Sequence, residues 1–124
     1  MRVFDDHTAG LVRDLCDLIV PGSARVWPER YIDAILARAQ EDDRAAALGC
    51  IQALAPAAGS AEALAARAGT PEFALVRALA VEAFYSDFVA PGAPGPSAYE
   101  EIDFTIELAS RVKHDWSYLL GAEA

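Results

Sequence analysis

Proline and glycine divide this chain into short segments, and each long segment carries apolar residues at helical spacing. The clearest helix start is Thr70-Pro71-Glu72, which joins a capping residue, a first-turn proline and an acidic first turn. No stretch alternates apolar and polar residues with the Val, Ile and Thr enrichment of a strand. The pattern predicts an all-α fold: a compact bundle of five or six helices in a single domain over residues 1–124.

The helix that starts at Thr70 is expected to reach about Asp87. It buries a stripe formed by Phe73, Val76, Leu79, Ala80, Ala83 and Phe84. Other helices are predicted over residues 8–20, 28–39, 60–68 and 97–120, with one more that carries Leu48, Ile51 and Leu54. Thr8 is expected to cap the first helix, and Asp42 or Asp43 the one with Leu48. A continuous helix through residues 41–43 is the alternative to that break.

The charge of the chain argues against two classes of partner. Its net charge is −9, so it repels phosphates, and we expect neither nucleic acid nor an anionic membrane as a partner. The N-terminal residues show no signal peptide, and the longest uncharged run is broken by Gly49, Pro56 and Gly59. Cys16 and Cys50 are expected to be buried free thiols. A cytoplasmic protein is therefore expected.

The sequence offers little catalytic chemistry. It lacks a dinucleotide-binding fingerprint and a cluster of metal ligands, so the chain is expected to bind no cofactor by itself. Glu100, Asp103 and Glu107 share one predicted helix face and suit either a hard cation or plain solvation. A small enzyme built on these carboxylates is one alternative, but we expect a chain that is not catalytic alone.

Aromatic residues are concentrated near a proline-rich loop. Residues 83–104 hold five of the eleven aromatic rings and three of the seven prolines. Phe84 continues the apolar stripe, whereas Tyr85 points about 100° away from it on a helix. Either the final segment folds back over these rings, or they face another protein. We predict the second, with an interface made by Trp27, Tyr85, Phe88, Tyr99, Phe104, Trp116 and Tyr118.

Three motifs carry a family resemblance over residues 11 to about 96. They are Ile19-Val20-Pro21 at a helix end, Tyr31-Ile32-Asp33 in the next helix, and Phe84-Tyr85-Ser86-Asp87 before a Gly/Pro-rich loop. In these motifs the chain resembles the small, gamma-like subunit (subunit 3) of gluconate 2-dehydrogenase-type enzymes. Many members of that family carry a twin-arginine export signal, which the N-terminal residues here do not show.

The resemblance implies a function through a partner. Small subunits of this family accompany a large flavoprotein of the glucose-methanol-choline class, which carries FAD and oxidises sugars or alcohols. The chain is therefore expected to be an accessory subunit that binds and stabilises such a dehydrogenase or oxidase in a hetero-oligomer. The alternative is a stand-alone helical interaction or regulatory module with no redox partner.

Overall fold

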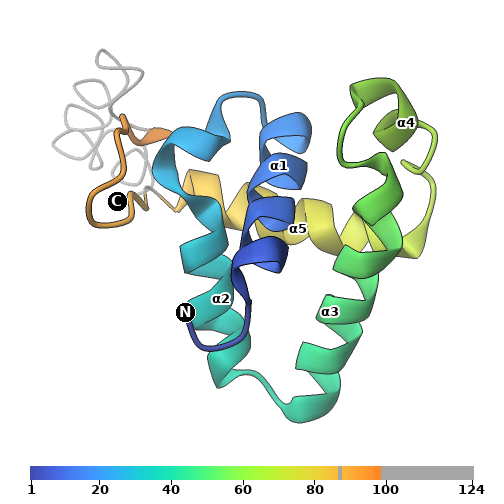
Figure 1. Ribbon diagram of the computed structural model, residues 1–124, viewed down its shortest axis with the longest axis horizontal. Coiled ribbons are helices and arrows are strands. Elements are labelled where there is room, and N and C mark those ends of the chain that lie inside the picture. The colour runs from blue at the N-terminus through green and yellow to red at the C-terminus, as the bar shows by residue number, and fades with distance from the viewer. Residues whose placement is uncertain (87, 99–124) are drawn as a thin grey trace, which may run out of the picture.

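The computed structural model describes residues 1–86 and 88–98 of the chain, and within them the all-α prediction is confirmed. The described residues contain five α-helices, two short 3-10 helices and no strand (Figure 1). The elements are α1 (Asp6–Ile19), η1 (Ser23–Val26), α2 (Pro28–Arg38), α3 (Glu41–Leu54), η2 (Ala55–Ala57), α4 (Ala61–Ala65) and α5 (Pro71–Tyr85). The predicted helix 97–120 lies almost wholly outside the described residues.

The helix starts follow local capping chemistry, with two corrections. Thr70 caps α5 as predicted, since its Oγ1 accepts the Phe73 N–H at 3.2 Å. The prediction of Thr8 as the cap of α1 is wrong, because the Asp5 carboxylate accepts the Thr8 N–H at 2.7 Å and the helix begins earlier.

The start of α3 is the second correction. Its N-cap is Gln40, and Asp42 and Asp43 lie in the first turn of the helix instead of capping it. There their charges still face the positive end of the helix dipole. The predicted break between α2 and α3 is confirmed, but it falls at Ala39 and Gln40.

The core lies where α5 packs against α1, α2 and α3 (Figure 1). The predicted stripe of α5 is buried at Val76, Ala80, Ala83 and Phe84. It meets Leu15 of α1, Ile32 of α2 and the α3 pair Ile51 and Leu54, all part of the same apolar cluster. Phe4 and Ala98 belong to this cluster too, so the described residues share one core from beginning to end.

The second half of α2 is held by hydrogen bonds to charged side chains. The Asp33 carboxylate is 4% exposed and accepts the backbone N–H groups of Arg2, Val3 and Phe4 at 2.9, 2.9 and 2.8 Å. At the end of the helix, the Arg44 guanidinium donates to the carbonyls of Leu36, Ala37 and Ala39 at 2.8, 3.4 and 3.1 Å. We call these residues, 33–39 with their partners, the clasped end of α2.

Candidate partner-binding surface

Backbone hydrogen bonds attach the proline-rich loop to η1. The Ala90 N–H donates to the Val26 carbonyl at 3.1 Å, and the Gly95 N–H donates to the Arg25 carbonyl at 3.0 Å. The Arg25 side chain also binds the loop: its Nε donates to the Pro96 carbonyl at 2.8 Å. The loop therefore places residues that follow α5 beside the start of α2, although more than fifty positions separate them in sequence.

Two aromatic rings meet where this loop crosses α2. Phe88 packs edge-on against Tyr31, with ring centroids 5.3 Å apart and an angle of 61° between the ring planes. The Tyr31 hydroxyl donates to Glu82 Oε2 at 3.1 Å, so α5 takes part in the same contact. Both rings are half-buried, which leaves part of each at the surface.

At the end of α5, two consecutive aromatic residues lie in different environments. Phe84 is 4% exposed and lies in the core, as predicted, whereas Tyr85 is 55% exposed. The two rings touch edge-on at 5.2 Å, and the Arg25 guanidinium lies 5.0 Å from the centre of the Phe84 ring. Apart from Met1, Tyr85 is the one large apolar side chain exposed among the described residues.

Trp27 occupies the junction between η1 and α2 in an uncommon backbone conformation. Its φ of 54° and ψ of 63° are left-handed values that few non-glycine residues adopt. Its half-buried ring faces Gly92, where an added Cβ would lie 3.6 Å from a ring carbon. Outliers of this kind cost about 1–3 kcal/mol and gather at functional sites.

A buried ion pair lies next to this junction. Glu29, in the first turn of α2, is fully buried, and its Oε2 accepts hydrogen bonds from Nε and Nη2 of Arg13. The hydrogen bond to Glu29 raises the pKa of Arg13, which keeps the guanidinium charged. The second oxygen of Glu29, Oε1, has no hydrogen-bond partner among the described residues.

Cys16, which is also buried, is an unreactive thiol. Burial raises the pKa of the Cys16 thiol to about 12, and the charges of Glu29 and Asp17 add to that shift. A thiol in this state forms almost no thiolate at neutral pH, so Cys16 is a core residue and no nucleophile. Cys16 and Cys50 are both free thiols, and Cys16 is buried as predicted, but the predicted burial of Cys50 is wrong, because this residue is only partly buried.

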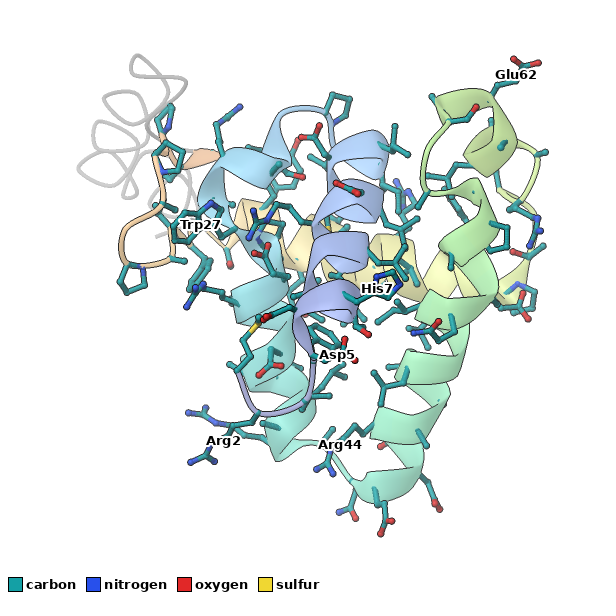
Figure 2. All side chains as sticks on the ribbon, viewed as in Figure 1. Arg2, Asp5, His7, Trp27, Arg44 and Glu62 are labelled. Carbon is teal, nitrogen blue, oxygen red and sulfur yellow. The ribbon has the colours of Figure 1, made fainter. Side chains whose placement is uncertain are left out.

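Of the sequence-predicted interface residues, Phe88 contacts Tyr31, whereas Tyr85 touches Phe84 and Trp27 touches Arg13, Arg30 and the loop at Gly92. We call Trp27 and Tyr31, at the start of α2, together with Tyr85 and Phe88, at and after the end of α5, the aromatic surface. Figure 2 shows Trp27 toward one end of α2, away from Arg2 and Arg44. Tyr99, Phe104, Trp116 and Tyr118 lie outside the described residues.

Sequence reasoning missed three residues of this region. Tyr31 had an available signal, since it stands four positions after Trp27 and in the Tyr31-Ile32-Asp33 motif. Arg25 and Arg30 had none, because their neighbours come from distant parts of the chain or depend on the conformation of Trp27.

The remaining predictions on chemistry concern cofactors and membranes. Among residues 1–86 and 88–98, no three His, Cys, Asp or Glu side chains are grouped so that they could hold a metal ion. In the same part of the chain, none of the helices has the length and apolar character needed to cross a bilayer. The carboxylates Glu100, Asp103 and Glu107 fall outside the described residues.

Comparison of the chain with models of known families, with curated proteins and with solved structures finds no match.

Proposed function

We propose that this chain is an accessory subunit that binds and stabilises a large FAD-dependent sugar or alcohol dehydrogenase or oxidase, with the FAD held by that partner. The observation that carries the binding role is the exposure of Tyr85, at the end of the helix whose Glu82 accepts the hydrogen bond of the half-buried Tyr31. The identity of the partner is supported by the resemblance of the motifs to the small subunits of gluconate 2-dehydrogenase-type enzymes.

Two of the three motifs lie on helices that a side-chain hydrogen bond joins, which supports the proposal. Tyr31 belongs to one motif, and Tyr85 belongs to another that begins fifty-three positions later. The Tyr31 hydroxyl reaches Glu82, which lies three positions before Tyr85 and so on the same side of α5. The Tyr31 motif therefore contacts, at the surface, the helix that carries the Tyr85 motif.

The aromatic surface has the composition of a binding site. Exposed tyrosine contributes area at a small entropic cost, and binding hot spots are enriched in Trp, Tyr and Arg. The loop beside it contains Pro91, Pro94 and Pro96 and is already fixed on η1. A partner that covers this surface therefore does not have to order a free loop.

We place the complex in the cytoplasm. Two free thiols, one of them partly exposed, fit a reducing compartment better than an oxidising one. The same surface would also serve a stand-alone interaction module, since nothing in its geometry requires a flavin. The redox partner and the module differ in one observable, which is whether the protein that binds this chain contains FAD.

Co-expression with a candidate flavoprotein of the glucose-methanol-choline class tests the proposal. The two chains should co-purify, and the visible absorbance of flavin should follow the large chain and be absent from the small chain alone. Replacing Tyr85 by Ala should cost ~2 kcal/mol of binding or more, about thirtyfold in affinity. The melting temperature of the free variant should stay unchanged, because Tyr85 lies mostly in solvent.

A matched control comes from the other end of α5. Phe73 is partly buried against the core. The Phe73→Ala variant should therefore be less stable than the wild type but bind the partner with unchanged affinity. A Tyr85→Ala variant that melts far earlier and still binds normally would refute the interface. Co-purification with a protein that contains no flavin would instead favour the stand-alone module.

A further inference from the structure

Two arginines share the ring of Trp27. The guanidinium carbon of Arg13 lies 5.6 Å from the ring centre, and that of Arg30 lies 5.2 Å from it. Guanidinium groups at such distances are attracted to the electron-rich face of an indole. The Trp27 ring therefore fixes the position of both cations, at the point where the backbone adopts its left-handed conformation.

Only one of these two cations is neutralised inside the described structure. Arg13 is paired with the buried carboxylate of Glu29. Arg30 is exposed, and none of the described carboxylates forms an ion pair with it. The carboxylate of Glu29 in turn allows two cations to share one ring, because it removes the repulsion that Arg13 would otherwise exert on Arg30.

The charge of Arg30 contrasts with that of the whole chain. At a net charge of −9, the protein as a whole repels acidic groups. Arg30 is the exception, because its exposed guanidinium is held on an aromatic ring and offers a planar pair of donors to a carboxylate. Such a site selects for one kind of partner segment and one orientation.

We infer that Arg30, held on the Trp27 ring, forms the docking site for an acidic segment of the partner protein, with a Glu or Asp carboxylate on the Arg30 guanidinium. This inference rests on the proposed function for the existence of a partner. It adds the chemistry of the partner segment, which the aromatic surface alone does not specify.

A peptide titration tests the site without the partner. Hexaglutamate is added to the ¹⁵N-labelled full chain, and the indole N–H signal of Trp27, assigned by its loss in Trp27→Phe, is followed. The signal should shift and saturate, the shift should weaken with salt, and hexalysine should leave it unmoved. Arg30→Glu should weaken peptide binding by about tenfold or more. Arg77→Glu, an equal charge change at an exposed position of α5, should not.

Two results with the peptide would overturn the inference. One is a Trp27 signal that hexaglutamate does not move, or that responds equally in the Arg77→Glu variant. The other is a gain of tenfold or more in peptide affinity when Glu100, Glu101 and Asp103 are replaced together by Gln, Gln and Asn. That gain would mean that acidic residues of this same chain compete for the site.

The partner complex separates this inference from the proposed function. If the flavoprotein co-purifies and Tyr85→Ala weakens the complex but Arg30→Glu does not, the acidic-segment inference is wrong and the proposed function stands. If hexaglutamate binds at Arg30 but no flavoprotein co-purifies, the docking chemistry stands and the proposed function is wrong. Arg30→Lys should bind with intermediate affinity, since it keeps the charge and loses the planar group.

Discussion

The two ends of helix α2 use the same kinds of residue for different purposes. At the clasped end, the Asp33 carboxylate accepts hydrogen bonds from three backbone N–H groups, and Arg44 donates to three carbonyls. Both charged groups are therefore satisfied by hydrogen bonds within the chain. At the other end, Glu29 keeps one oxygen without a partner among the described residues and Arg30 is exposed. Figure 2 places Arg2 and Arg44 toward one end and Trp27 toward the other. The exposed Arg30 is therefore available to a partner, whereas the buried oxygen of Glu29 is not.

We call the start of α2, residues 27–31, its open end. The largest effect should come from breaking the buried ion pair there. Arg13→Met leaves the fully buried Glu29 without its cation, and we expect a loss of about 3 kcal/mol in the free energy of unfolding. This is the low end of the usual range, because the Arg13 side chain is itself 41% exposed. Urea unfolding measures it.

A second variant shows whether the loss comes from the uncompensated charge. Arg13→Met combined with Glu29→Met removes both members of the pair, and most of the stability should return. A double variant as unstable as the single one would mean that Arg13 acts through packing on Trp27 and not through Glu29.

The clasped end should show the next largest effect. Asp33→Asn keeps the shape of the side chain but replaces one acceptor oxygen by an NH2 group that faces backbone donors. We expect a loss of about 2 kcal/mol, typical of hydrogen bonds to a buried charged group. Asp43→Asn, exposed on α3, is the matched control and should change stability by less than about 0.5 kcal/mol. Equal effects at the two positions would argue against the clasp.

The pH dependence of that loss gives a finer test. Burial alone would raise the pKa of Asp33, but the N–H groups of Arg2, Phe4 and Val3 outweigh it and hold the pKa below its usual 3.8. A depressed pKa in the folded state means that the stabilisation is fully present above the unfolded-state pKa and is lost as the pH falls through the folded-state value. The difference between wild type and Asp33→Asn should therefore be constant near neutral pH and shrink below pH ~4. A difference that stays constant down to pH ~2 would contradict a charge effect.

The smallest effect on stability should come from removing the hydrogen bonds that Arg44 donates to the C-terminal carbonyls of α2. Arg44→Gln removes the donors to the last carbonyls of α2, which then turn to water. We expect a loss of about 1 kcal/mol, measured by urea unfolding. Arg38→Gln removes an exposed cation from the last turn of the same helix and should cost a few tenths of a kcal/mol at most. A larger loss at Arg38 would show that the helix dipole matters more than the cap.

The fold was largely predictable because it follows local chemistry. Thr70-Pro71-Glu72 begins a helix wherever it occurs, and the stripe that ends in Phe84 needs only helical spacing to be recognised. The errors at Thr8 and at Asp42 or Asp43 are of a few residues at most. At these starts several side chains within one turn can serve as caps, and tertiary packing chooses among them.

The site was predictable only in part, because it depends on contacts between distant residues. The exposure of Tyr85 follows from its angle to Phe84 on a helix, so the sequence was sufficient there. The partners of Asp33 lie about thirty positions away, and Phe88 lies still farther from Tyr31. The left-handed Trp27, a conformation usually given to glycine, had no local signal at all.

Hydrogen exchange of the chain, alone and bound to the flavoprotein that we propose as its partner, tests the central claim most directly. If the open end of α2 and the end of α5 form the partner surface, amides in residues 25–31 and 82–86 should exchange more slowly in the complex. Amides in residues 33–48, at the clasped end and along α3, should be unchanged. Protection concentrated in residues 33–48, with residues 25–31 and 82–86 unaffected, would place the interface at the wrong end of the helix and contradict the account.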